Sequence, residues 1–261
     1  MAVALAANAA DYTALFAPLE HTGWKDYDKK TRAYVYILTR ILQLEQIRPL
    51  LLAVIRHFPP KEATLAFKLF LSWSVRFLIA GGGGAGVLDR HYGLRAKEIT
   101  EGEVKTAAAL SEKMKGIVRT DAEFVEGLRR ARVSKKHLAR YYLRALELSK
   151  VGAKDADLGG VLEDTAVYNL EHIIPLSPNE KWNLPDEIVQ GYSKRLGNMT
   201  LLDPTENMDS GNKSFEEKLL IFKASPLLIT QEIAKNQKWG PDEIDARQAV
   251  MAATALDIWK L

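Results

Sequence analysis

The spacing of apolar residues changes near residue 160, and this change limits the folds open to the chain. Before that point, for example between residues 31 and 58, apolar residues recur every three or four positions, which is the period of a helix that buries one face. After it, the apolar runs at 170–176 and 199–202 are short and bounded by Pro, Asn and Gly, as is typical of strands. The sequence therefore predicts a mainly α protein, with a helical domain over 1–160 and a second domain over 161–261 in which two short strands lie among helices.

Proline and polar residues mark where the expected helices start and stop. Pro49 interrupts the first of them, Ser134 is a plausible N-cap, and Ser214 with Glu217 has the pattern of a capping box. We expect helices over residues 31–58, 61–80, 96–119, 121–131 and 134–150, and then over 214–223, 230–238 and 242–261.

Two segments of the helical part admit a functional interpretation that the sequence does not favour. The glycine-rich segment 81–86 lacks the Gly-Lys-Ser/Thr that a phosphate-binding loop carries after a strand, so we interpret it as a flexible connector. The apolar segment 63–80 contains Lys68 and Arg76, whereas a membrane span needs about 20 apolar residues with few or no charges. We therefore expect a buried helix there, and no membrane partner.

Cysteine is absent from the 261 residues. This excludes disulfides, cysteine-ligated zinc and thiol catalysis, so a metal ion would be held by histidine, carboxylates, amides or water. The net charge of +3 is too small to indicate a nucleic-acid partner by itself. The composition is compatible with a cytoplasmic protein.

The stretch that can carry chemistry begins with Glu-His-Ile-Ile-Pro at 171–175 and continues through Asn198 to Asn207. Hydrolysis of a phosphodiester needs an activated water, a cation on the developing charge and stabilisation of the leaving oxygen. A neutral imidazole, such as that of His172, can take the proton of the water. Carboxylate and amide oxygens are hard ligands suited to Mg²⁺, and this stretch contains both.

Glu171 and His172 are neighbours in the expected strand. Neighbouring side chains of a strand point to opposite faces, so these two cannot aim at one point on an ideal strand. We therefore expect a bend or the end of the strand at this pair.

The motifs resemble those of the His-Me finger (HNH) nucleases, specifically the C-terminal nuclease domain of GmrSD-type modification-dependent restriction enzymes. The similarity covers about residues 165–261 and extends more weakly over the preceding helices, which look like the spacer of such proteins. It implies a small ββα-metal core embedded in helices. The matching features are Glu-His-Ile-Ile-Pro at 171–175, Arg-Leu-Gly-Asn-Met-Thr-Leu-Leu at 195–202, Asn207, Asn212, Phe215, Lys218, Trp239, Arg247-Gln248 and Ile258-Trp259.

The resemblance implies a role for each matching polar residue. His172 is the general base, and Glu171 and Asn207 hold a single divalent cation, Mg²⁺ or Mn²⁺. Asn198 is the middle asparagine of the site, which braces the loop between the strands. Asn212 is a weaker candidate that we interpret as a helix-start residue. Contacts to phosphate are implied for Arg195 and Lys218.

The resemblance also implies a metal-dependent DNA endonuclease or nickase, the nuclease part of a bacterial, cytoplasmic restriction system that acts against phage DNA. In such proteins a sensor/NTPase domain lies N-terminal to this region and carries an Asp-Gly-Gln-Gln-Arg-like motif. That motif is not found in this sequence. We therefore expect a fragment, or a subunit that lacks the sensor, and do not extend sensing of modified DNA or nucleotide hydrolysis to this chain.

A basic cluster precedes the second domain, with no acidic residue between positions 129 and 144. Helical spacing puts Lys136, Arg140 and Arg144 on one face. The cluster fits a surface that tracks DNA phosphates and an ordinary solvated face about equally well. The candidates for DNA binding are Arg129, Arg130, Arg132, Lys135, Lys136 and Arg140.

Other interpretations of the same residues stay open. His172 also fits a core histidine, Glu171 a simple partner of a basic residue, and Asn207 a turn residue. The main alternative function is a non-catalytic nucleic-acid-binding or scaffold module of a restriction complex. A nuclease that acts on RNA is a third.

Overall fold

The structure is a computed structural model, which describes residues 10–81, 85–152 and 167–261. The chain divides into two compact units, one of Met1–Thr120 with Trp259–Leu261 and one of Asp121–Ile258. The domain boundary predicted between residues 160 and 161 lies outside the described residues. The unit that contains the strands begins at Asp121, so it includes the last two helices expected before that boundary.

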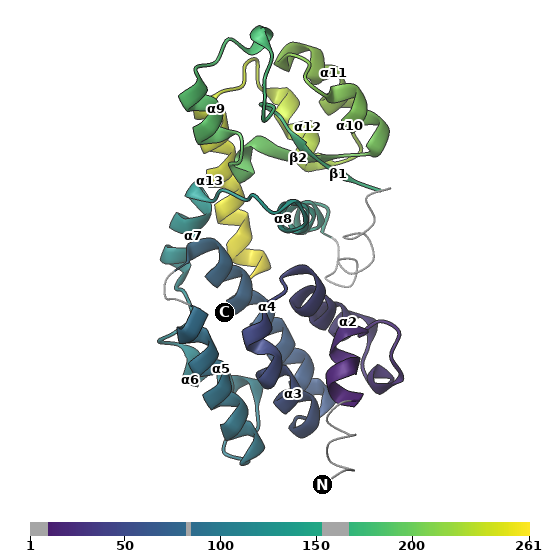
Figure 1. Cartoon of the computed structure of the whole chain (residues 1–261), viewed down its shortest axis with the longest axis vertical. Helices are drawn as coiled ribbons and strands as arrows, with labels where there is room; N and C mark the ends of the chain where they lie inside the picture. The colour runs from purple at the N-terminus through teal and green to yellow at the C-terminus, as the bar shows by residue number, and fades with distance from the viewer. Residues whose placement is uncertain (1–9, 82–84, 153–166) are drawn as a thin grey trace. The chain divides into compact units, whose positions relative to one another are not determined.

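The first unit is built from helices, most of which start at a polar residue or a proline. They are α2 (Lys29–Tyr36), α3 (Arg48–His57), α4 (Pro60–Ala80), α5 (Ala85–Thr100) and α6 (Ala107–Met114) (Figure 1). Asp28 caps α2, because its carboxylate accepts a hydrogen bond from the backbone N–H of Thr31 at 2.7 Å. Pro49 lies in the first turn of α3, where a missing N–H breaks no helical hydrogen bond, so the helix restarts at this proline as predicted.

Within the described residues, α4 has the length and composition of a helix that could cross a membrane. More than half of its most apolar stretch is buried inside the protein. The guanidinium of Arg76 is also buried, and donates to the carbonyl oxygens of Trp259 at 2.9 Å and Arg119 at 3.1 Å. These contacts are those of a core helix, which agrees with the sequence-based expectation.

The glycine-rich segment joins two helices. Gly81 ends α4 with a φ of 65°, a conformation that side chains other than glycine disfavour, and α5 begins at Ala85. Residues 82–84 of this segment lie outside the described residues.

The second unit encloses a two-stranded antiparallel sheet of β1 (Asn169–His172) and β2 (Met199–Leu202). Glu171 pairs with Thr200 and His172 with Met199. The predicted fold class, mainly α with a small core that contains the two strands, is confirmed. The helices of this unit are α7 (Asp121–Arg130), α8 (Lys136–Lys150), α9 (Asp186–Tyr192), α10 (Pro204–Ser210), α11 (Phe215–Ala224), α12 (Leu228–Gln231) and α13 (Pro241–Ile258).

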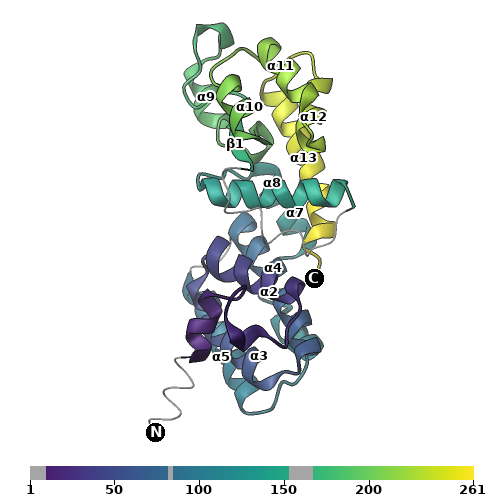
Figure 2. The same cartoon turned by 90° about the vertical axis from the view of Figure 1, so that its right-hand side faces the viewer.

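Helices cover both faces of the sheet. Figure 1 and Figure 2 show α8 beneath the strands, on the side opposite to α10 and α11. All four residues of β2 are buried, so the short strand is fixed between these layers. A core of apolar side chains continues from the sheet into the helices, and its members are Ile173, Ile174, Leu202, Phe215, Phe222, Ile233, Trp239 and Ile244.

Several element boundaries differ from the expected ones. The strand expected over 170–176 ends at His172, which meets the requirement for a strand end at the Glu171–His172 pair. The N-cap of α8 is Lys135 rather than Ser134. Helix α10 was not expected, although Asp203 with Glu206 forms a capping box around Pro204 at its start.

Gly197 allows β2 to start directly against α13. Its backbone N–H donates to Oε1 of Gln248 at 2.8 Å. A Cβ at this position would lie 2.5 Å from the carbonyl oxygen of Ile244 and 2.9 Å from Cβ of Gln248. Relief of such a contact requires the backbone to shift, which costs free energy, so the loop that leads into β2 requires glycine at this position.

We expect Gly197→Ala to lower the free energy of unfolding by roughly 1–3 kcal/mol, because the added methyl group overpacks the junction of the loop with α13. Urea denaturation followed by circular dichroism measures this change. Gly191→Ala is the matched control, since a Cβ there meets nothing within 4 Å. Equal stability of the two variants would contradict the close packing described here.

Candidate active site

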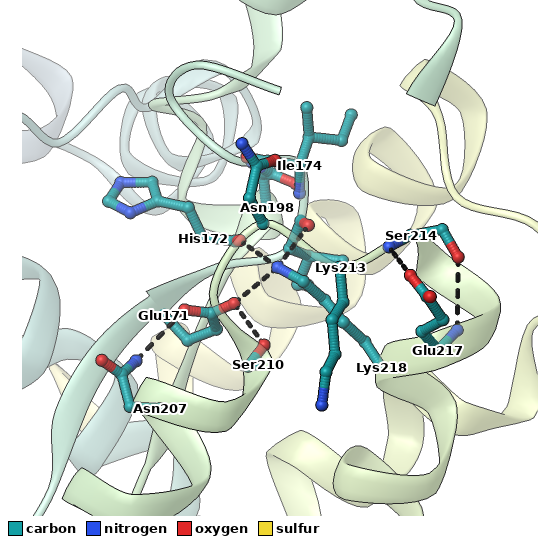
Figure 3. A network of polar contacts seen from close by, with 12 residues as sticks. Glu171, His172, Ile174, Asn198, Asn207, Ser210, Lys213, Ser214, Glu217 and Lys218 are labelled. Carbon is teal, nitrogen blue, oxygen red and sulfur yellow. Dashed lines mark hydrogen bonds and ion pairs between the residues drawn. The ribbon is translucent and has the colours of Figure 1, made fainter. Parts of the chain in front are cut away.

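The carboxylate of Glu171 lies at the centre of a buried polar network (Figure 3). Its Oε1 accepts hydrogen bonds from Oγ of Ser210 and from Nζ of Lys218, each at 2.6 Å. Its Oε2 accepts from Nδ2 of Asn207 at 3.1 Å. Asn207 and Ser210 are one helical turn apart on α10, so the two reach Glu171 from the same face of that helix.

Lys218 brings a buried positive charge to Glu171. Its side chain has an exposed fraction of 0%, and its ammonium also donates to the carbonyl oxygens of His172 and Ile173, both at 3.2 Å. Burial lowers the pKa of Lys218, and the charge of Glu171 opposes that shift. The ammonium therefore ties α11 to the end of β1 through one carboxylate and two carbonyl groups.

The imidazole of His172 lies on the other face of β1. Figure 3 shows the ring pointing away from the Glu171 carboxylate and from Asn207, as alternation along a strand requires. The ring is half-buried, and this burial, followed by the charges of Lys136, Lys218 and Lys194, lowers the pKa of His172 to about 4. The imidazole is therefore neutral near pH 7 and can accept a proton.

Asn198 holds the loop between the strands with its whole carboxamide. Its Oδ1 accepts from the backbone N–H of Ile174 at 2.9 Å and from Nε1 of Trp239 at 3.1 Å. Its Nδ2 donates to the carbonyl oxygens of Ile174 at 2.9 Å and Ser193 at 3.1 Å. The residue is fully buried, and its hydrogen bonds hold the end of β1 next to the start of β2.

Asn212 also braces a loop. Its Oδ1 accepts from the backbone N–H of Asn179 at 3.1 Å, and its Nδ2 donates to the carbonyl oxygen of Ser177 at 2.9 Å. The N-cap of α11 is Ser214, so the interpretation of Asn212 as a helix-start residue is wrong. Its contacts hold the segment that leaves β1 next to the segment that enters α11.

The structure places the two predicted phosphate contacts differently from the sequence-based expectation. Lys218 is buried against Glu171, which leaves no part of its ammonium open to a phosphate. Arg195 is committed to protein groups, because its Nη2 contacts Oδ1 of Asp245 and the carbonyl oxygen of Arg129, both at 2.6 Å. Both residues therefore hold the site together in this structure.

The residues of the predicted basic cluster fall into two groups. Arg140 is buried, whereas Arg130 and Arg132 are exposed but contact protein groups, Glu126 and the carbonyl oxygen of Gln190, each at 2.6 Å. The side chains of Arg129, Lys135 and Lys136 are exposed as well. Lys194 is exposed as well, and the sequence analysis did not single it out.

Glu171 and Asn207 are the residues that could hold a metal ion. Among the described residues, no group of three His, Asp or Glu side chains lies close enough together to hold a metal ion. Mg²⁺ commonly takes only one or two carboxylates and keeps several waters, so a carboxylate with one amide oxygen is a sufficient protein contribution. Rotation of the Asn207 carboxamide that exchanges its nitrogen and oxygen brings Oδ1 beside Oε2 of Glu171. These two oxygens then fit a single hard cation.

Ser210 and Lys218 complete the coordination of Glu171 by protein groups, and the sequence did not reveal Ser210. The only signal was the spacing of Asn207 and Ser210 on one face of a helix that was itself not expected. Ser210 and Lys218 both donate to Oε1 of Glu171, so Oε2 is the oxygen that faces Asn207.

We expect Lys218→Met to lower the free energy of unfolding by roughly 3–5 kcal/mol, because it leaves the carboxylate of Glu171 buried without its cation. Urea denaturation measures the loss. Lys181→Met is the matched control, since it removes an exposed partner of another carboxylate, Glu217, and should have little effect. Adding Glu171→Gln to Lys218→Met should recover part of the stability, and a loss no larger than that of the control would refute a buried pair.

A family model described as the C-terminal domain of GmrSD restriction endonucleases matches residues 118–254. The match covers more than half of the chain and includes every residue of the Glu171 network, His172 and Asn198. The chain matches no curated protein.

Proposed function

Because the chain belongs to the family of GmrSD restriction endonuclease C-terminal domains, we propose that it is a nuclease that hydrolyses DNA phosphodiester bonds with His172 as the general base. We propose further that it needs one divalent cation, Mg²⁺ or Mn²⁺, held by Glu171 and Asn207, as in nucleases of the HNH type. The restriction context favours a bacterial cytoplasmic protein that acts against phage DNA beside a sensor/NTPase domain.

The observation that carries the proposal is the arrangement at the end of β1. A neutral imidazole lies on one face of this strand, and a carboxylate–amide pair lies on the other face, one residue away. Within the described residues, β1 pairs only with β2, so its other edge borders no strand. A phosphodiester that lies across this strand end can meet the base and the oxygen ligands together.

Each residue then has a separate task. His172 takes the proton from a water that attacks phosphorus, and its low pKa keeps it unprotonated at neutral pH. Ser210 and Lys218 hold one oxygen of Glu171 so that the other faces Asn207. A bound divalent cation would stabilise the charge that develops on the phosphate and on the leaving oxygen.

One observation favours the non-catalytic alternative, a nucleic-acid-binding or scaffold module. Lys218 already neutralises Glu171, and Glu171 is only 7% exposed, so the network would hold β1 in place without any cation. Under that alternative the chain binds DNA but does not cut it. The third possibility is a nuclease that acts on RNA. Such an enzyme would cleave labelled RNA, and unlabelled RNA would inhibit this cleavage whereas unlabelled DNA would not.

Nicking of supercoiled plasmid by the full chain tests the proposal. We expect nicking with Mg²⁺ or Mn²⁺ and none with EDTA. His172→Ala should slow nicking roughly 10²- to 10⁴-fold, because the reaction loses its general base. His57→Ala is the matched control, since this exposed histidine lies in α3 of the first unit. Undiminished nicking by His172→Ala, or nicking in EDTA, would refute the assignment.

A further inference from the structure

Helix α8 packs against the sheet on the side opposite to α10 and α11, the helices that hold Glu171 (Figure 1, Figure 2). The side chain of His172 points to the α8 side, because it and Glu171 leave β1 on opposite faces. Figure 1 views α8 end-on while the strands lie across the view, so the helix crosses the strands. The guanidinium of Arg144, in the middle of α8, lies over the ring of Tyr168, 5.5 Å from its centroid, and so attaches the helix to the segment that enters β1.

Backbone pairing places the start of α8. The segment 131–133 runs antiparallel to 194–196: the N–H of Val133 donates to the carbonyl oxygen of Lys194 at 2.9 Å, and Arg132 bridges to Arg195. The next residues of that second segment reach the end of β1, because the carbonyl oxygen of Asn198 accepts from the N–H of Ile173 at 2.9 Å. The start of α8 is thus attached to the same loop as the His172 end of the strand.

Lys136 and Lys194 arrive at this place from two different segments. Lys136 is the first residue of α8, and Lys194 precedes the loop that leads into β2. Both side chains are exposed, unlike that of Lys218. The positive end of the α8 helix dipole adds to the charge of the two lysines at this place.

We propose that Lys136 and Lys194 bind the DNA phosphate that lies against His172, as positioning residues supplied by α8 and by the loop before β2. Two ammonium groups beside a neutral imidazole provide charge for a phosphodiester without protonating the base. This inference rests on the proposed function, which it deepens by assigning the phosphate contact. It also replaces the predicted contacts by Arg195 and Lys218, which are committed to protein groups.

DNA binding by the full chain tests the inference without catalysis. The His172→Ala background and EDTA prevent cleavage, and the anisotropy of a fluorescein-labelled duplex reports binding over a series of NaCl concentrations. We expect Lys136→Gln with Lys194→Gln to weaken binding at least roughly tenfold. The slope of log K against log[salt] should fall by about 2, since each lost phosphate contact removes nearly one released counterion.

Two controls separate charge from structure. Lys223→Gln removes an exposed lysine of α11 and should leave affinity and slope unchanged. Lys136→Arg with Lys194→Arg keeps both charges and should restore most of the binding. If the double Gln variant bound DNA with the same affinity and the same salt slope as Lys223→Gln, the inference would be overturned.

A local measurement places the phosphate at His172. In a chain with native His172 and in EDTA, the ring C–H NMR signals of His172 should shift when the duplex is added, and the shift should be lost in the double Gln variant. Absence of the shift in the native chain would overturn the inference. Failure of the nuclease proposal has a different signature: the native chain would show these binding effects but would not nick plasmid with any divalent cation.

Discussion

The buried ion pair between Lys218 and Glu171 is the interaction on which the geometry of the site depends. One ammonium group contacts the carboxylate and the carbonyl oxygens of the two residues that follow, so it fixes the side chain and the end of β1 together. Ser210 completes this arrangement from α10. A carboxylate buried in this way is stable only because its hydrogen bonds and its counter-charge are all supplied. The helices that supply them, α10 and α11, each begin with a capping box.

The alternation of side chains along a strand determines what the site can do. Glu171 and His172 are adjacent, so their side chains leave β1 on opposite faces and meet different layers. Glu171 faces the helices that follow β2, whereas His172 lies on the side of the sheet against which α8 packs. In the proposed mechanism a phosphodiester meets both groups only at the strand end, so the bracing of that end by Asn198 serves the mechanism as well as folding.

Sequence patterns with a local cause were predictable. Apolar periodicity gave most of the helices, the period of two gave the conflict between Glu171 and His172, and Ser214 with Glu217 gave the start of α11. The pairing of Asn207 with Glu171 came from the resemblance alone. The burial of Lys218 could not be predicted, because a lysine one turn into a capped helix looks like a surface residue until α11 is placed against β1. The proposed role of Lys194 could not be predicted for the same reason, since its position depends on pairing with the distant segment that contains Val133.

The central claim is that Glu171 and Asn207, fixed at the end of β1, offer two oxygens to one cation beside a neutral His172. Crystals of the full chain soaked in MnCl₂, with an anomalous difference map recorded for manganese, test it most directly. We predict one peak at about 2 Å from Oε2 of Glu171 and from Oδ1 of Asn207, with the ammonium of Lys218 still on Oε1. A map without a peak at this pair, in crystals where manganese binds elsewhere, would contradict the claim.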